Sequence, residues 1–270
     1  LSNLSRNVGQ FFEEYHSNYR NAEIWLLKSI NYQIETGKEF DVNSITSPVG
    51  LLTKTYLKQN KYDEALELRE RIATYHKSIN QFSQETASAL ASSAKLYRAL
   101  GRPDQAELKY AEALEVYEKI ALESSSNEAK YDIANTLHSL ALTIQDQGQY
   151  TDAREKLEKS YVIMEDLSKT GEYVNAMPNF INSLAEIYRI EALNNDNDKK
   201  TLEERAENLY LEAIRILRED KLNNGEPKQQ ELLAIVLSNL SSLYCQPSRW
   251  EEAEKIHMEA LIVFEEDIKA

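Results

Sequence analysis

Apolar residues recur through most of this chain at positions i, i+3, i+4 and i+7, which is the spacing of one buried stripe on an α-helix. The stripes come in pairs, over residues 51–72, 90–114, 137–161, 181–214 and 237–261. One alanine stands at the same place in the second helix of every pair: Ala65, Ala106, Ala153, Ala206 and Ala253. Self-similarity at this period predicts stacked helix pairs, and therefore a solenoid.

Small side chains and boundary residues support this reading. Ala94, Ala141 and Ala185 occupy the predicted first helices, where two helices can approach closely only if the contact residue is small. Ser47 followed by Pro48 predicts a helix N-terminus. Capping boxes of the form S/T-x-x-E predict helices that begin just after the first residue of each box: Ser125 with Glu128, Thr201 with Glu204, and Ser248 with Glu251.

The helix pairs resemble the tetratricopeptide repeat, whose signature is W-x2-L-G-x2-Y followed by A-x3-F, A and P. Two pairs carry most of it: Leu184, Ala185, Tyr188, Ala206, Tyr210 and Ala213, and Leu90, Ala94, Tyr97, Ala106, Tyr110 and Ala113. The closing proline is missing throughout. The resemblance covers residues 47–268 and implies an all-α fold, a right-handed superhelical solenoid of stacked antiparallel helix pairs.

The spacing of the repeats is longer than the usual 34 residues. Successive repeat alanines lie 41, 47, 53 and 47 residues apart, so the second helices are expected to run on for extra turns. This is similar to the long-helix repeats of kinesin light chains and related bacterial proteins, in which first helices with an LNNLA-like sequence are typical. The corresponding stretches here are INSLA, residues 181–185, and LSNLS, residues 237–241.

The two ends of the chain are expected to cap the solenoid, because the outer face of a terminal repeat meets water. Residues 1–46 are predicted to hold a degenerate N-terminal helix pair that acts as a cap, and residues 47–270 five repeat-like pairs of the same solenoid. The last helix, which ends in FEEDIKA, is expected to be the cap at the other end. The insertion Asn194–Lys200 inside the fourth of the five pairs is predicted to be a solvated loop.

Composition narrows the classes of partner. The chain has 270 residues, a formal charge of −14 and one cysteine, Cys245. A strongly acidic chain is a poor ligand for duplex nucleic acid or an anionic membrane, because both need Lys and Arg to neutralise phosphate. No apolar run approaches the roughly 18 residues that span a bilayer, so no membrane insertion is expected. The single cysteine favours a reducing intracellular compartment, the cytoplasm or an organelle interior. A start at Leu1 without methionine or signal peptide suggests a processed form or an expressed fragment.

No residue pattern predicts an enzyme, a metal or a cofactor. The acidic run NNDND lacks the glycine and the glutamate that a calcium loop needs at its sixth and twelfth positions. Ser92 and Lys95 form an S-x-x-K, but the accompanying S-D-N and K-T-G are absent. The four histidines form no H-x-x-x-H pair for a metal. Most of the sixteen tyrosines fall at repeat positions, which favours packing over stacking on nucleic-acid bases.

The resemblance implies that the first helices line a concave groove through fixed repeat positions. These positions hold five Lys or Arg and two acids, Asp146 and Glu186, in a chain whose total charge is strongly negative. Such a contrast can focus potential in a cleft. The candidate groove residues are Lys54, Lys58, Lys95, Arg98, Asn135, His138, Asn179, Asn182, Arg189 and Asn239.

Two functions of different classes follow. The first is a non-enzymatic adaptor or scaffold that binds a protein or peptide in the groove. An acidic segment would lie around Lys54, Lys58, Lys95 and Arg98, with the asparagines hydrogen-bonding its backbone. The second is a constitutive structural subunit of a larger assembly, an organellar or protease-adaptor complex included. Such a subunit would be held by its edges or convex face, and an exposed apolar patch there would favour it. Hsp70 or Hsp90 tails are not expected partners, because Gly50 and Lys54 stand where their clamp has Lys and Asn.

Overall fold

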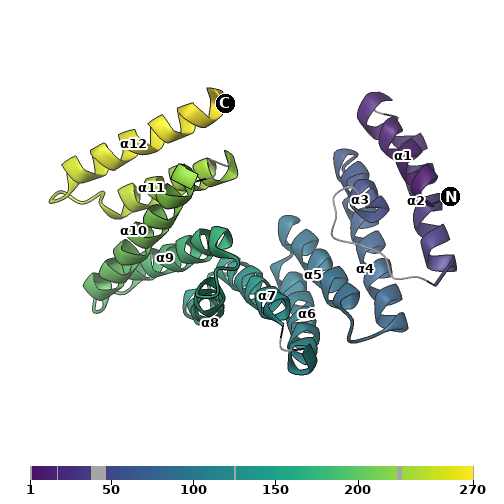
Figure 1. Ribbon diagram of the computed structural model, residues 1–270, viewed down its shortest axis with the longest axis horizontal. Coiled ribbons are helices and arrows are strands. Elements are labelled where there is room, and N and C mark those ends of the chain that lie inside the picture. Colours follow the sequence, from purple (N-terminus) through teal and green to yellow (C-terminus); the bar gives the residue numbers. More distant parts are fainter. Residues whose placement is uncertain (1, 17, 38–46, 125, 224–226, 270) are drawn as a thin grey trace. The chain divides into compact units, whose positions relative to one another are not determined.

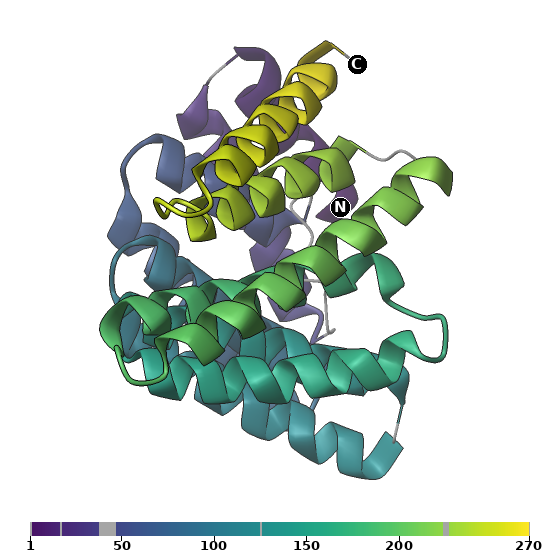
Figure 2. The same ribbon diagram turned by 90° about the vertical axis from the view of Figure 1, so that its left-hand side faces the viewer.

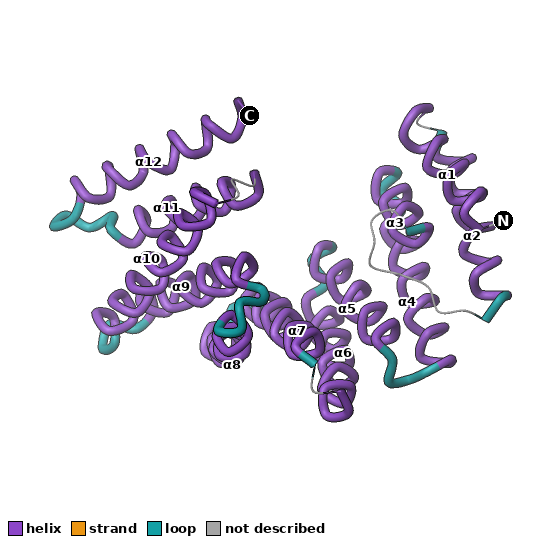
Figure 3. Tube along the Cα trace, viewed as in Figure 1, coloured by secondary structure: helices purple, strands orange, loops and turns teal. Residues whose placement is uncertain are grey.

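A computed structural model describes residues 2–16, 18–37, 47–124, 126–223 and 227–269, which form twelve α-helices and no strand (Figures 1 and 3). The first helices of the pairs are α1 (Ser2–His16), α3 (Pro48–Lys58), α5 (Gln84–Ala99), α7 (Asn127–Asp146), α9 (Met177–Asn194) and α11 (Pro227–Leu243). The second helices are α2 (Tyr19–Glu35), α4 (Tyr62–Ile79), α6 (Pro103–Ser124), α8 (Tyr150–Ser168), α10 (Lys199–Asn223) and α12 (Trp250–Lys269). The predicted all-α fold of stacked helix pairs is confirmed.

The chain divides into two compact units. Unit 1 comprises Leu1–Thr143 and unit 2 comprises Ile144–Ala270, so the boundary falls near the end of α7. In unit 2, α9 contacts both α8 and α10, as the two views in Figures 1 and 2 show. The division into a cap of residues 1–46 and five further pairs stays a prediction, and its boundary lies in residues 38–46, outside the described residues.

The repeat alanines lie in the helix contacts, as their pattern predicted. Each is at most 3% exposed, and larger apolar side chains such as Leu52 and Ile72 in unit 1 or Leu217 in unit 2 fill the space around them. The α1–α2 pair is equally close, because a Cβ added to Gly9 would lie 2.7 Å from Leu26. Removal of these apolar surfaces from water stabilises the stack, and each pair supplies part of the core of its neighbour.

Repeat tyrosines join two of the pairs in unit 2 to the preceding pair. The hydroxyl of Tyr188 donates to Glu158 at 2.6 Å, and that of Tyr244 donates to Glu207, also at 2.6 Å. Burial and the adjacent Glu207 raise the pKa of Tyr244 to about 12. Arg249 completes the second group by binding Glu207 at 2.8 Å. These tyrosines are therefore structural links between repeats, in agreement with their predicted packing role.

Helix starts show where local signals succeed and fail. Ser47 accepts a hydrogen bond from the Gly50 amide at 3.0 Å, so the predicted cap of α3 is confirmed. Thr201, in contrast, lies inside α10, because that helix begins two residues earlier and the amide of Leu202 bonds to the Asp198 carbonyl. The helix α12 differs in the opposite direction, because it begins one residue later than the Ser248 box predicts. The third box cannot be compared, since Ser125 lies outside the described residues. An S/T-x-x-E pattern also fits the first turn of a helix, so its register is ambiguous.

The outer face of α12 differs from the expected solvated cap. Eleven residues after the repeat alanine, four second helices place a buried side chain, at most 5% exposed: His76, Tyr117, Met164 and Leu217. At the same position of α12, Phe264 is 49% exposed, and Leu261 nearby is 45% exposed. In the other pairs these positions are buried between helices. In α12 the same stacking face stays apolar and is exposed among the described residues.

Candidate functional site

In unit 1, the cations of the predicted groove lie on two first helices. Lys54 and Lys58 are exposed one turn apart on α3, and Lys95 is exposed on α5 with the half-buried Arg98 three residues later. Side chains at these spacings share a face of a helix. We call these four residues the cationic face. Leu52, two residues before Lys54, and Leu96, between Lys95 and Arg98, are buried in the core, so the basic side chains lie on other sides of their helices.

The helix α7 adds polar groups near Arg98. Asn135 is exposed, and His138 is half-buried one turn later. Burial, together with the positive charge of Arg98, lowers the pKa of His138 to about 4. His138 is therefore neutral at pH 7, so it can donate or accept a hydrogen bond there but adds no charge. Arg98 and His138 are therefore close enough for the charge of one to affect the protonation of the other.

In unit 2, two of the predicted asparagines bind each other. The side-chain amide of Asn239 on α11 donates to the carbonyl oxygen of Asn182 on α9 at 3.0 Å. Asn179 is exposed one turn earlier on α9. These amides therefore line up along the first-helix face of unit 2, where they offer donors and acceptors instead of charge.

Arg189 belongs to an internal network. Its guanidinium donates to both carboxylate oxygens of Glu186, at 2.6 and 2.9 Å, and the hydroxyl of Tyr210 donates to the same carboxylate at 2.7 Å. The bonds to Glu186 raise the pKa of Arg189. Because Glu186 cancels this charge, the positive balance predicted for the groove comes from the four residues of the cationic face in unit 1.

Among the described residues, no group of three or more His, Cys, Asp or Glu is placed to hold a metal ion. Within the same residues, no helix has the length and apolar character needed to span a membrane.

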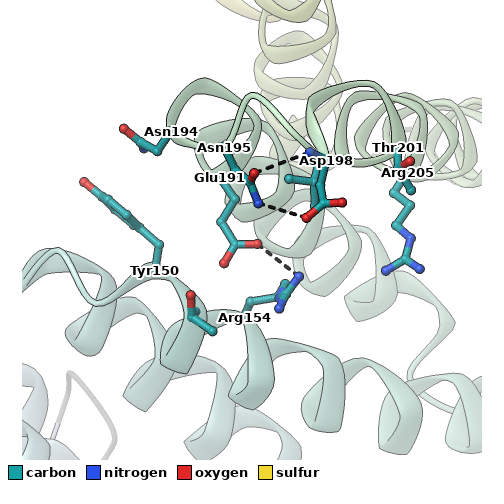
Figure 4. Close-up of a pocket in the computed structure, with 10 residues that line it drawn as sticks. Tyr150, Arg154, Glu191, Asn194, Asn195, Asp198, Thr201 and Arg205 are labelled. Atoms are coloured by element: carbon teal, nitrogen blue, oxygen red, sulfur yellow. Dashed lines mark hydrogen bonds and ion pairs between the residues drawn. The ribbon is translucent and has the colours of Figure 1, made fainter.

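Sequence reasoning missed a pocket in unit 2. The pocket has a volume of about 490 Å³ and lies between the start of α8 and the connection from α9 to α10 (Figure 4). Its lining includes Arg154, Glu191, Asn194, Asn195 and Arg205. The insertion Asn194–Lys200 was the available signal in the sequence, since it spans the connection from α9 to α10. Its first residues form one wall of the pocket instead of a loop that contacts only solvent.

Two segments of the chain, residues 49–78 and 89–122, match the tetratricopeptide repeat family. They correspond to the helix pairs α3–α4 and α5–α6 of unit 1. No curated protein matches the sequence of the chain.

Solved structures share the fold over most of the chain. BtubC (BKLC) from P. vanneervenii has a TM-score of 0.66 at 15% identity, covering 97% of this chain and 87% of that one. A putative kinesin light chain of Podosopora anserina, with nearly identical TPR-like repeats, has a TM-score of 0.58 at 18% identity over 81% of this chain and 94% of that one. A signal transduction ATPase with numerous domains and a tetratricopeptide repeat sensor, from Pyrococcus horikoshii, has a TM-score of 0.66 at 16% identity, covering 99% of this chain and 37% of that one.

Proposed function

Because the chain is a tetratricopeptide-repeat protein with the fold of the kinesin-light-chain type, we propose that it is a binding adaptor whose cationic face receives an acidic peptide segment of a partner protein. Stacked helix pairs present long surfaces to partners, which is the usual role of this architecture. The observation that supports the acidic partner is the charge contrast. Lys54, Lys58, Lys95 and Arg98 lie on the first helices of unit 1, whereas the whole chain has a charge of −14.

The chemistry of the face suits an extended acidic chain. The two lysines of α3 are flexible point charges, and the guanidinium of Arg98 can bind a carboxylate through two parallel hydrogen bonds. Asn135 and the neutral His138 would hydrogen-bond the peptide backbone, since each can both donate and accept.

Charge reversal on α5 tests this proposal. We expect the double variant Lys95→Glu and Arg98→Glu to bind a short fluorescein-labelled peptide rich in Asp and Glu about tenfold more weakly than the unaltered chain, because two attractions become repulsions. Binding is measured by fluorescence anisotropy. Added salt should weaken the unaltered complex, because exposed charges are screened.

The matched control reverses Lys77 and Lys119, which lie on the second helices α4 and α6 of unit 1. This variant has the same net charge and should keep most of the affinity. A peptide in which Asn and Gln replace every Asp and Glu should not bind. If the α5 variant binds the acidic peptide as tightly as the control variant does, the proposal is wrong.

The exposed stacking face of α12 favours the second candidate function, a structural subunit. Leu261 and Phe264 are 45% and 49% exposed, at positions that a neighbouring helix covers in other pairs. Contiguous exposed apolar residues of this kind mark interaction surfaces. A partner helix with a small-residue stripe would fit there as a first helix of the next pair does.

For this second function we expect the chain in extracts of its source cells to migrate in size-exclusion chromatography at a mass above that of the free chain. The double variant Leu261→Asp and Phe264→Asp should migrate as the free chain, because burial of the two new carboxylates would be unfavourable. An exposed pair on α6, Leu108→Asp with Leu122→Asp, is the control. Migration of the unaltered protein as a free chain would count against a permanent assembly.

A further inference from the structure

A second groove lies in unit 2, away from the first-helix face. Leu184, Tyr188 and Glu191 of α9 form its floor, and side chains of α8 and α10 form its two walls. At 3.6 residues per turn, these floor residues lie on the opposite side of α9 from Asn182 and Arg189. We call it the α8–α10 groove. It consists of the polar pocket of Figure 4 and an adjoining pocket of about 480 Å³, and Arg205 lines both.

The polar half is held open by internal bonds. Arg154 of α8 binds Glu191 at 3.1 Å, and Glu191 is 9% exposed, so an ion pair forms the base of the pocket. The Nε atom of Arg154 is buried there without a hydrogen bond. Asn195 closes the loop by donating to the Asp198 carboxylate at 3.0 Å and accepting from the Asp198 amide at 3.3 Å. Figure 4 shows this loop facing α8 across the pocket.

Arg205 stands where the two pockets meet. Its guanidinium lies 5.6 Å from the centre of the Tyr188 ring and donates to the Tyr188 hydroxyl at 3.4 Å. Among the described residues no carboxylate forms an ion pair with Arg205. Arg249 shows the contrast: it also stacks on the repeat tyrosine of its own pair, yet it binds both Glu207 and Glu252 at 2.8 Å. Arg205 is thus an exposed guanidinium, oriented by Tyr188, that can donate hydrogen bonds to a carboxylate of a ligand.

The other half of the groove is mostly apolar. Tyr161 and Val162 of α8, Leu184 of α9 and Leu209 of α10 line it together with Glu158 and Asn208, and Val162 is 59% exposed. The Glu158 carboxylate there accepts a hydrogen bond from the Tyr188 hydroxyl at 2.6 Å. Its volume is within the 300–1,000 Å³ that is usual for ligand pockets. An apolar side chain placed there would be removed from water beside a positive charge.

We propose that the α8–α10 groove binds a short peptide segment of a partner protein in which an acidic side chain lies next to an apolar one. The carboxylate binds Arg205, and the apolar side chain enters the pocket of Tyr161, Val162 and Leu209. The peptide backbone extends over the polar half, where Arg154 and Glu191 offer a donor and an acceptor to its carbonyl and amide groups. This site is independent of the cationic face, which lies in unit 1.

Random peptides displayed on phage and selected on the whole chain test this proposal. We expect enrichment of peptides in which Asp or Glu lies within three residues of Leu, Ile, Met or Phe. Synthetic forms of the enriched peptides should bind Arg205→Glu at least fivefold more weakly than the unaltered chain. Val162→Asp should weaken them as well, because it places a charge in the apolar pocket.

Two controls separate this site from others. Arg215→Glu makes the same charge change on α10 away from the groove and should keep the affinity, and so should the double variant Lys95→Glu and Arg98→Glu on the cationic face. Circular dichroism confirms folding, which is expected because Arg205 and Val162 are both exposed. If no such peptides are enriched, or if those enriched respond to the α5 variant and not to Arg205→Glu, the groove is not their site.

Discussion

Replacement of Tyr210 by alanine is expected to lower the free energy of unfolding by about 3–5 kcal/mol, the usual cost of removing a large buried aromatic side chain. Tyr210 is 0% exposed in the contact between α9 and α10, and its hydroxyl donates to Glu186 at 2.7 Å. The change leaves a cavity and deprives the carboxylate that holds Arg189 of one donor. Urea unfolding of the whole chain, followed by circular dichroism, measures the loss.

Tyr210→Phe separates the two contributions to this loss. It keeps the ring and removes the hydrogen bond, so we expect a loss of about 1–2 kcal/mol. Leu211→Ala, at the next residue of α10, is the control, because Leu211 is 47% exposed and its truncation should cost well under 1 kcal/mol. Equal effects of Tyr210→Ala and Leu211→Ala would contradict the burial seen in unit 2.

Acidification is expected to destabilise unit 1 through His138. The pKa of this histidine is about 4 in the folded chain, against an ordinary value of 6.5. Above pH 6.5 the group is neutral in both states and has no effect. Between these two pKa values the unfolded chain binds a proton that the folded chain does not, so the free energy of unfolding falls as the pH falls. From pH 7 to pH 5 the loss due to His138 is about 2 kcal/mol.

Urea unfolding at several pH values, with amide hydrogen exchange to assign the loss to unit 1, measures this effect. His138→Asn should flatten the pH dependence in part. It should not abolish it, because burial also lowers the pKa of His76 in α4, which acts with the same sign. His257→Asn, at an exposed position of α12, is the control. An unchanged pH dependence in His138→Asn would show that this imidazole meets water in the folded chain.

Much of the fold could be predicted from single residues, because contacts between neighbouring helices restrict which residue types fit at given positions. Ala106 and Ala153 mark helix contacts that only a small side chain allows, and Ser47 with Pro48 marks a helix start that depends on neighbouring backbone groups alone. Thr201 was misleading, since the capping pattern does not specify its own register. There Asp198, held by Asn195, directly precedes the helix, and its carbonyl accepts from the Leu202 amide.

The candidate site was readable only in part. Repeat positions assigned Lys95 and Arg98 to one first helix, and both lie on α5, where a three-residue separation puts them on one helical face. Their use as a binding site stays a prediction. The repeat positions did not show that Arg189 is neutralised, since that depends on Tyr210 orienting Glu186 from another helix. No sequence pattern identified Arg205 as a site residue, because it lies between two pockets that form only when α8, α9 and α10 have packed.

By itself, the sequence determined that this chain forms stacked pairs of helices, with basic residues at the repeat positions of Lys54, Lys58, Lys95 and Arg98. Periodicity and small-residue spacing are properties of each helix and of its nearest neighbour, so they can be read along the chain. Only the tertiary structure decided which charges are paired, which stacking face is uncovered and where a pocket opens. Those outcomes depend on side chains that lie far apart in sequence and meet only when several helices have packed.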